Sequence, residues 1–429
     1  MLRVRHASHA VGALSAEGRE LRFVYAPAWL GAPHAFALSP RLPLAEPAYV
    51  GEEVLFFFAN LLPEGNVLDT LCRLRRLPRG NVLRMLEAFG RECAGAFELV
   101  PDTEPDAIVQ GKPRYLEYSR ARLATDLAHL RDNVPLLHSH GGLRLSLAGA
   151  QNKIPVRYAD GQLFLPAQGA PSTHILKPAL QPDTLFPDSV LNEAVCLRLA
   201  QAVGLDVPDI QVLTDPEPIL LIERYDRIVH PKHIQRLHQL DFCQLGGILP
   251  DQKYEADGGP GLVDVFARID QHSAMPALDR LQAVDWLLFN FLVGNADAHG
   301  KNLSMLYGPD GTLRLAPAYD LLSLAHWPQL SQTMAMAIGG EHRPEWVMAR
   351  HWQTLCEAAG LNLTQLRKRA IDLANRTIQR LPQVLDGVHD LRCDRFADGF
   401  AATLERRAGW IETRLVAAEA NTRIERPTK

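Results

Sequence analysis

Residues Phe289 to Leu306 read FNFLVGNADAHGKNLSML, an apolar run that stops at a polar loop. Five polar or ionisable residues fall within eight positions of this loop, and Asp297 and Asn302 stand five apart. Phosphoryl transfer needs a carboxylate that accepts the proton of the attacking hydroxyl and an amide oxygen that helps to hold a phosphate-bound metal, and kinases space these two groups as D-x-x-x-x-N. Taken alone, the same pair is more often a turn that caps a buried helix. The flanking sequence decides between the two interpretations.

The residues after the loop predict a hairpin that returns the chain to Asn302. Strand-like segments at 303–307 and 312–316 flank the turn sequence Gly308-Pro309-Asp310-Gly311. Pairing residue 307 with residue 312 places Asn302 opposite Pro317. At roughly 3.3 Å per strand residue, Asp320 then lies within about 10 Å of Asn302.

Two neighbouring carboxylates repel one another unless a cation neutralises them. Magnesium prefers a few carboxylates together with phosphate oxygens and water. We therefore expect Asn302 and Asp320 to bind Mg²⁺ and Asp297 to remain as the catalytic base. No cysteine or histidine cluster competes for a transition metal, and His299 is expected to be a hydrogen-bond donor rather than a metal ligand.

A kinase also needs a cation that contacts the nucleotide phosphates. Lys177 ends the apolar strand His174-Ile-Leu-Lys177. Its ammonium group must either pair with an acidic group or extend to solvent. Glu193 lies on the following predicted helix with apolar residues on both sides, so this carboxylate also requires a partner. An ion pair between a strand lysine and a helix glutamate is the kinase arrangement for the α- and β-phosphates.

The segment Ser146-Leu-Ala-Gly-Ala-Gln-Asn-Lys153 joins two expected strands and contains several small residues. Its backbone N–H groups would suit phosphate oxygens. The segment matches neither G-x-G-x-x-G nor a Walker A loop, so an ordinary hairpin turn stays the alternative.

Composition narrows the class of protein. The chain has 429 residues, of which 47% are apolar and 22% charged, with a net charge of −4. These values predict a fully folded chain of two or three domains and exclude nucleic-acid binding through overall charge. Six cysteines without a C-x-x-C pair indicate reduced thiols and a cytoplasmic protein. No apolar stretch approaches the roughly 18 residues of a membrane span, and the first residues lack a secretory signal, so no membrane partner is expected.

The order of predicted elements favours an α+β, two-lobed protein-kinase-like fold. We expect a small mixed N-terminal domain at 1–105, with a strand at 21–29 and helices at 52–62 and 82–89. A kinase N-lobe should follow at 106–226, with a helix at 115–131 and an antiparallel meander of strands at 143–148, 154–158, 162–166 and 174–177. A helix at 189–203 and a strand at 219–223 complete that lobe. Residues 227–429 should form an all-helical C-lobe apart from the hairpin near 303–317.

Several motifs in this order resemble the HipA-type toxin kinases. They are Ser146-LAGAQNK-Ile154, His174-ILKP, Glu223-RYDR, Arg236-LHQLDFCQ, Lys253-YE, Gly258-GPG, Asn295-ADAHGKN and Pro317-AYDLL, with Asn60-LLPEG and Gly95-AFELVP in the first hundred residues. The resemblance covers nearly the whole chain. It implies a bacterial serine/threonine protein kinase, the toxin of a toxin–antitoxin pair that acts in persistence, with ATP and magnesium in its cleft and an aminoacyl-tRNA synthetase as its substrate.

The resemblance also assigns roles by motif position. Asp297 would be the base, Asn302 and Asp320 the metal ligands, and Lys177 the phosphate contact. Further nucleotide contacts would come from the phosphate loop, the hinge and the catalytic loop, namely Ala148, Gly149, Ala150, Gln151, Lys153, Glu223, Tyr225 and His299. Ser146 matches a serine whose autophosphorylation ejects the loop. Asn152 departs from the family pattern, which usually has an acidic residue there, so loop behaviour can differ.

The resemblance implies a helix-turn-helix antitoxin of the HipB type, whose complex binds operator DNA mainly through the antitoxin. Two other functions stay open. The first is a small-molecule kinase of the same architecture, because the phosphoryl machinery does not specify the acceptor. The second is a catalytically idle co-repressor that only supports an antitoxin on DNA.

Overall fold

The computed structural model describes residues 1–104, 113–131, 151–181, 185–388, 391 and 393–416. Contacts along the chain divide it into two compact units. Unit 1 comprises Met1–Thr184, Asp209–Asp251 and Ser304–Ala316, and unit 2 comprises Leu185–Pro208, Gln252–Leu303 and Pro317–Lys429. The three-part division expected from the sequence, at 1–105, 106–226 and 227–429, stays a prediction.

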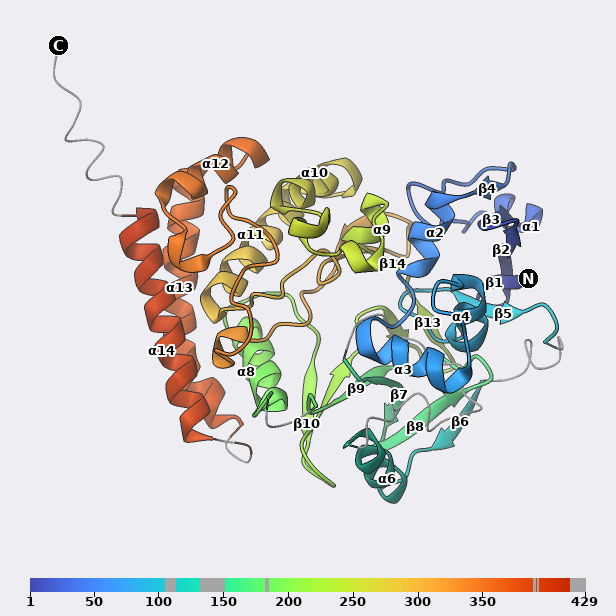
Figure 1. The fold of residues 1–429 in the computed structure, drawn as a ribbon, viewed down its shortest axis with the longest axis horizontal. Coiled ribbons are helices and arrows are strands. Elements are labelled where there is room, and N and C mark those ends of the chain that lie inside the picture. The colour runs from blue at the N-terminus through green and yellow to red at the C-terminus, as the bar shows by residue number, and fades with distance from the viewer. Residues whose placement is uncertain (105–112, 132–150, 182–184, 389–390, 392, 417–429) are drawn as a thin grey trace, which may run out of the picture. The chain divides into compact units, whose positions relative to one another are not determined.

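The N-terminal part of unit 1 is a five-stranded antiparallel sheet with four helices (Figure 1). Its strand order is β4-β3-β2-β1-β5. Burial alternates along β3, as expected for a strand with one face in a core. The elements are β1 Leu2–His6, β2 His9–Glu17, β3 Glu20–Tyr25, α1 Pro27–Leu30, β4 Tyr49–Val50, α2 Glu52–Ala59, α3 Gly65–Arg75, α4 Val82–Phe89 and β5 Glu98–Pro101.

Three predicted elements of this part can be compared with the structure. The helix predicted at 52–62 is α2, which ends three residues earlier, at Ala59. The helix predicted at 82–89 is α4, and the Asn81 side chain caps it by accepting the N–H of Arg84 at 3.0 Å. The strand predicted at 21–29 is wrong in its second half, because Pro27 starts helix α1. Proline favours the first position of a helix because its φ is fixed at a helical value and because an N–H group there has no acceptor within the helix. This preference explains why the chain changes from strand to helix at Pro27.

The second sheet of unit 1 has six antiparallel strands in the order β10-β11-β9-β7-β8-β6. The Asp160-Gly161 turn joins β7 and β8 with both residues at positive φ, as the hairpin prediction requires. The expected meander is wrong at β9, which pairs with β7 instead of β8. The strands are β6 Arg114–Glu117, β7 Ile154–Ala159, β8 Gln162–Ala167, β9 His174–Pro178, β10 Ile210–Leu213 and β11 Ile219–Glu223. The strand expected at 143–148 lies outside the described residues.

The helix predicted at 115–131 begins later than expected. Residues 114–117 form edge strand β6 against β8, and helix α6 covers Arg120–Arg131. The Tyr115 hydroxyl donates to the Pro171 carbonyl at 2.9 Å, which adds to the pairing with β8. Tertiary strand pairing therefore overrides the helical spacing at residues 115–117.

Unit 1 ends in two small sheets, β12-β13 and β14-β15-β16. The sequence predicted a mainly helical chain after residue 226 with one hairpin, and it missed three short strands that precede that hairpin. The hairpin itself is present, with Tyr307 paired to Leu313 rather than to residue 312. Thr312 belongs to the turn because its N–H and hydroxyl both donate to Asp310. The elements are β12 Arg227–Val229, β13 Ile234–Arg236, β14 Gln239–Asp241, α9 Phe242–Gly246, β15 Ser304–Tyr307 and β16 Leu313–Leu315.

A buried cluster of six charged side chains joins separate segments of unit 1. The Glu92 carboxylate accepts from Arg224 at 3.2 Å, from Arg227 at 3.0 Å and from Arg236 at 2.5 Å. Asp226 and Glu98 complete the pairing of the three guanidinium groups. Burial alone would raise the pKa of Glu92, but the charges of Arg236, Arg227 and Arg224 hold it well below its usual value. The cluster fixes residues 92–98 against the segment that follows β11.

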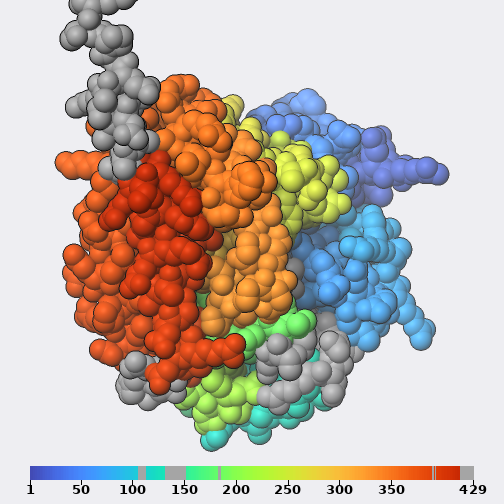
Figure 2. Space-filling view, turned by 60° about the vertical axis from the view of Figure 1, so that its left-hand side comes forward, coloured from blue at the N-terminus to red at the C-terminus, as the bar shows by residue number. Residues whose placement is uncertain are grey.

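Unit 2 is helical in its described part, and its core lies among the long helices. Contacts link α11 with α10, α13 and α14, and α13 with α8. Figure 2 shows α13 and α14 at the surface, in orange-red and red. The Asn362 side chain caps α13 by accepting the N–H of Gln365 at 3.0 Å. The helices are α8 Ser189–Ala202, α10 Leu262–His272, α11 Pro276–Val293, α12 Ala349–Ala359, α13 Leu363–Asp386, α14 Asp394–Trp410 and the π-helical Ile411–Val416.

None of the six cysteines forms a disulfide bond, as expected, and all except Cys393 are buried. None of the helices in the described part of the chain has both the length and the apolar character needed to cross a bilayer. The mixture of antiparallel sheets and helices confirms the α+β class.

Candidate active site

The polar loop singled out in the sequence follows the C-terminal end of helix α11 in unit 2. Gly294 ends the helix with φ +77°, and its N–H donates to the Asn290 carbonyl at 3.1 Å. A Cβ atom at Gly294 would lie 2.7 Å from the Ala325 Cβ, so only glycine fits the turn without a shift of its neighbours. The helix end therefore fixes where the polar loop begins.

The structure brings Asn302 and Asp320 together, as the sequence predicted. The Asn302 Nδ2 atom lies 3.4 Å from Asp320 Oδ2. Asn302 is 4% exposed, and its buried Oδ1 atom has no hydrogen-bond partner among the described residues. A buried oxygen in this state is costly unless something else binds it. An amide oxygen and a carboxylate side by side are donors that suit Mg²⁺, so these residues fit the expected ion.

Asp297 is held by two further contacts in unit 2. The Tyr254 hydroxyl donates to Asp297 Oδ1 at 2.7 Å, and the Asp297 N–H donates to Asn295 Oδ1 at 3.1 Å. Tyr254 lies in a segment fixed to the loop by a bond from the Gly300 N–H to the Lys253 carbonyl at 3.2 Å. The contact with Tyr254 shows that a hydroxyl group can lie within hydrogen-bonding distance of the Asp297 carboxylate. The same carboxylate can therefore accept a hydrogen bond from the hydroxyl group of another molecule.

His299 is 6% exposed, and its ring packs nearly perpendicular to that of Tyr254, with ring centroids 5.2 Å apart. Burial, followed by the charge of Lys253, lowers the pKa of His299 well below its ordinary value, while Asp320 opposes the shift. The Lys301 N–H donates to His299 Nδ1 at 3.3 Å. The neutral ring therefore carries its proton on Nε2 and is a hydrogen-bond donor there.

The other predicted site residues are distributed over both units. Lys177 is 5% exposed in strand β9 of unit 1, and Glu193 is 5% exposed in helix α8 of unit 2. Their ion pair stays a prediction. Glu223 ends β11 with an exposed side chain, and the Tyr225 hydroxyl donates to Gln239 Oε1 at 2.5 Å.

The phosphate-loop predictions are only partly covered by the structure. Gln151 Nε2 lies 3.4 Å from the Pro178 carbonyl oxygen, and Lys153 is half-buried just before β7. Ser146, Ala148, Gly149 and Ala150 lie outside the described residues, so their expected roles stay predictions.

Sequence reasoning missed two residues that contact the predicted base. Asn295 and Tyr254 both lie in quoted motifs, but neither was given a role. A polar amide directly after an apolar helix was the available signal for Asn295. Tyr254 lies 43 positions before Asp297, and no spacing rule connects the two residues.

Among the described residues, no group of three or more His, Cys, Asp or Glu side chains could hold a metal ion. A transition-metal centre is thus not indicated there. The magnesium candidate is a different kind of site, since it consists of one amide and one carboxylate.

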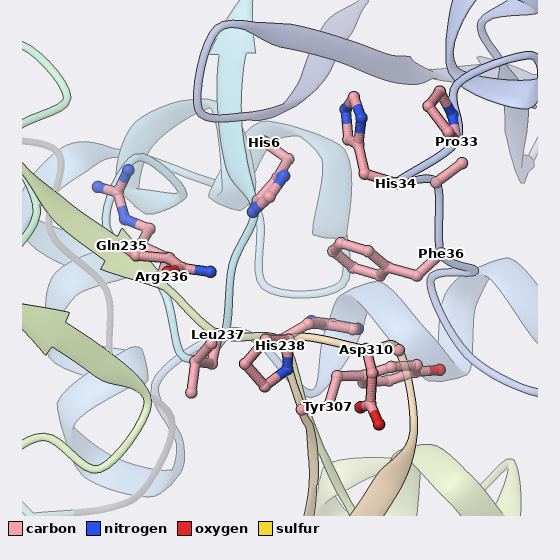
Figure 3. Close-up of a pocket in the computed structure, with 14 residues that line it drawn as sticks. His6, Pro33, His34, Phe36, Gln235, Arg236, Leu237, His238, Tyr307 and Asp310 are labelled. Atoms are coloured by element: carbon pink, nitrogen blue, oxygen red, sulfur yellow. The ribbon is translucent and has the colours of Figure 1, made fainter.

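Unit 1 contains a separate cavity of about 330 Å³, drawn in Figure 3. His6, Phe36, His238 and Tyr307 are among its lining residues, and the rings of Phe36 and Tyr307 stack on His238 at centroid distances of 5.5 and 5.1 Å. Arg236 also lines the cavity but is paired with Glu92 and Glu98. Three histidines and two other aromatic residues are thus among its 14 lining residues, together with the polar side chains of Gln235 and Asp310.

His238 makes the stability of unit 1 depend on pH. The ring is 2% exposed, with Nε2 at 2.7 Å from the Leu38 carbonyl oxygen, and burial lowers its pKa to about 3. Below pH 6.5 the unfolded chain binds a proton that the folded chain does not, so stability falls as pH decreases from 6.5 towards 3. We expect His238 to contribute a loss of about 2 kcal/mol between pH 6.5 and pH 5.

Urea denaturation at these two pH values, for the wild type and His238→Gln, measures the contribution. Glutamine keeps an N–H donor for Leu38 but does not titrate. The loss on acidification should be about 2 kcal/mol smaller in the variant. An equal loss in both proteins would contradict the assignment.

The chain matches two protein-family models, the HipA N-terminal domain over residues 2–100 and the HipA-like C-terminal domain over residues 145–385. It is 39% identical over 398 residues to the protein Y4mE of Sinorhizobium fredii, covering 89% of this chain and 92% of the relative. It is 31% identical over 398 residues to the serine/threonine-protein kinase toxin HipA of Shewanella oneidensis, covering 88% of this chain and 89% of that protein.

A solved structure of HipA, HipB and operator DNA from Shewanella oneidensis contains a similar chain. The TM-score is 0.80 at 26% identity, and the match covers 96% of this chain and 99% of that chain. The protein described here therefore has an α+β, kinase-like fold. It belongs to the HipA family and is a HipA-type kinase.

Proposed function

We propose that the chain is an ATP- and Mg²⁺-dependent serine/threonine protein kinase that acts as the toxin of a bacterial toxin–antitoxin pair. The observation that carries this proposal is the buried Asn302 Oδ1 atom, without a partner among the described residues, beside Asp320 and on the same loop as Asp297. Kinases use such an amide and two such carboxylates for phosphoryl transfer. Membership of the HipA family supports the toxin role.

In the proposed mechanism, Asn302 and Asp320 would hold Mg²⁺, which would neutralise charge on the phosphate oxygens. Asp297 accepts the proton of a serine or threonine hydroxyl while the hydroxyl oxygen forms a bond to the γ-phosphorus. The bond from that phosphorus to the bridging oxygen breaks, and ADP leaves. His299 donates its Nε2 proton in a hydrogen bond to a phosphate oxygen, and Lys177, supported by Glu193, contacts the other phosphates.

The remaining parts of the nucleotide site follow from the family resemblance. Residues 148–151 and Lys153 would contact the phosphates, and the backbone around Glu223 and Tyr225 would contact adenine. Ser146 would be the regulatory autophosphorylation site. These assignments belong to the proposal as a whole and can be tested one residue at a time.

The proposed partners are a HipB-like antitoxin, operator DNA bound mainly through that antitoxin, and an aminoacyl-tRNA synthetase as substrate. The similar structure from Shewanella oneidensis contains HipA, HipB and operator DNA, which supports the first two. Cysteines without disulfide bonds agree with the cytoplasm as the proposed site of action.

The test is transfer of labelled phosphate from ATP to the proteins of a cell extract, with and without Mg²⁺. We expect a labelled protein of synthetase size that disappears when Mg²⁺ is removed. Label confined to small molecules would favour the small-molecule kinase. A protein that binds neither ATP nor Mg²⁺ in calorimetry would favour the idle co-repressor.

A further inference from the structure

Asn295 is hydrogen-bonded to the backbone of Asp297 in the polar loop and to that of Asp320, which follows strand β16. Its Oδ1 atom accepts the Asp297 N–H at 3.1 Å, and its Nδ2 atom lies 3.3 Å from the Asp320 carbonyl oxygen. The residue is 5% exposed. The buried side-chain amide of Asn295 is thus hydrogen-bonded to the backbone of the predicted base and to the backbone of a predicted metal ligand.

The orientation of this amide is determined by its surroundings. A backbone N–H at Asp297 requires an acceptor, and a backbone carbonyl at Asp320 requires a donor, so the oxygen and nitrogen of Asn295 cannot be exchanged. Asn290 strengthens the choice. Its Nδ2 donates to the Trp286 carbonyl at 2.8 Å, which turns its Oδ1 towards Asn295 Nδ2 at 2.7 Å. The last turn of α11 therefore fixes the amide of Asn295.

The backbone of Asp320 needs this support. Its φ is +57°, a left-handed conformation that carries a steric cost for any residue with a Cβ atom. The bond from Asn295 to the Asp320 carbonyl favours this conformation over an extended one. Without that bond, the chain can relax and move the Asp320 carboxylate away from Asn302.

We propose that Asn295 is a positioning residue that sets the distance between the catalytic base and the metal-binding carboxylate. This inference rests on the proposed kinase function of the same loop. Asparagine is required because the position needs one acceptor and one donor at the same time. Alanine supplies neither, and aspartate supplies only acceptors.

The experiment compares the full-length wild type with Asn295→Ala, Asn295→Asp and the control Asn362→Ala. The control removes a side-chain-to-backbone bond at the cap of α13, in the same unit but in another helix. We expect both Asn295 variants to lower kcat for labelled phosphate transfer about 100-fold, with KM for the protein acceptor unchanged. The control should keep the wild-type kcat.

Two measurements do not depend on phosphate transfer. Electron paramagnetic resonance of Mn²⁺ with a non-hydrolysable ATP analogue should show about tenfold weaker Mn²⁺ binding in both Asn295 variants. Hydrogen exchange at the Asp297 amide should be faster in Asn295→Ala than in the wild type or the control. Thermal unfolding checks that each variant is folded, and Asn295→Asp serves if the alanine variant is not.

The outcomes separate this inference from the proposed function. An active wild type whose folded Asn295 variants keep kcat and Mn²⁺ affinity would overturn the positioning role. Full activity of Asn295→Asp would overturn the argument that a donor is required. A wild type without phosphate transfer would count against the kinase proposal, while the exchange rate at Asp297 would still report on the Asn295 bond.

Discussion

Replacing Asp297 with asparagine should lower the rate of phosphate transfer by a factor of about 10² to 10⁴. The proposed base accepts a proton from the substrate hydroxyl, and an amide cannot do so. The substitution preserves shape, and the amide oxygen can still accept the Tyr254 hydroxyl that lies 2.7 Å from Asp297 Oδ1. The loss should therefore appear in kcat while the protein stays folded.

Asp310→Asn is the matched control for this experiment. Asp310 lies on the turn between β15 and β16 in unit 1, and its Oδ1 accepts from the Thr312 N–H and hydroxyl. An asparagine oxygen accepts the same bonds, so the control should transfer phosphate at the wild-type rate. Initial rates with labelled ATP and saturating cell extract measure both variants. Equal rates for Asp297→Asn and Asp310→Asn would remove Asp297 from the role of base.

Glu92→Gln should lower the free energy of unfolding of the chain by about 3–5 kcal/mol. The Glu92 side chain is 2% exposed and accepts bonds from three arginines that are themselves buried. Removing its charge leaves the guanidinium groups with only Asp226 and Glu98 as charged partners in the cluster. A buried charge without a partner destabilises the protein by more than the original ion pair stabilised it, because water cannot replace the missing carboxylate.

The control for the charge cluster is Glu53→Gln, the same substitution in a pair with Arg41. Both side chains of that pair are more than one-third exposed, so its removal should change stability by about 1 kcal/mol at most. Urea denaturation followed by intrinsic fluorescence gives both values. Similar losses for the two variants would show that the buried cluster contributes no more than a surface pair.

The sequence predicted those elements whose signals are local. Helix α4 has a capping asparagine directly before its amphipathic face, and the Asp160-Gly161 turn has the backbone freedom that a two-residue hairpin needs. Strands β12, β13 and β14 were missed because each has only three residues and depends on a partner elsewhere in the chain. The register of the β15–β16 hairpin was wrong by one residue because Thr312 bonds to Asp310 in the turn.

The part of the candidate site that could be predicted is the part in which the spacing of residues along the sequence brings the reacting groups together. The five-residue interval from Asp297 to Asn302 and the hairpin that returns to Asp320 are visible in the sequence, and the structure confirms that Asn302 and Asp320 lie together. Asn295 and Tyr254 could not be assigned this way. Their roles depend on hydrogen bonds whose partners are set by the end of α11 and by a distant loop.

The amides of Asn290 and Asn295 give the polar loop a scaffold that does not titrate. Carboxamide side chains neither gain nor lose protons in the range where enzymes are assayed. Acidification or alkalinisation should therefore leave the hydrogen bonds to Asp297 and Asp320 unchanged until the unit unfolds. A plot of rate against pH would then report the ionisation of the reacting groups themselves, free of any rearrangement of their support.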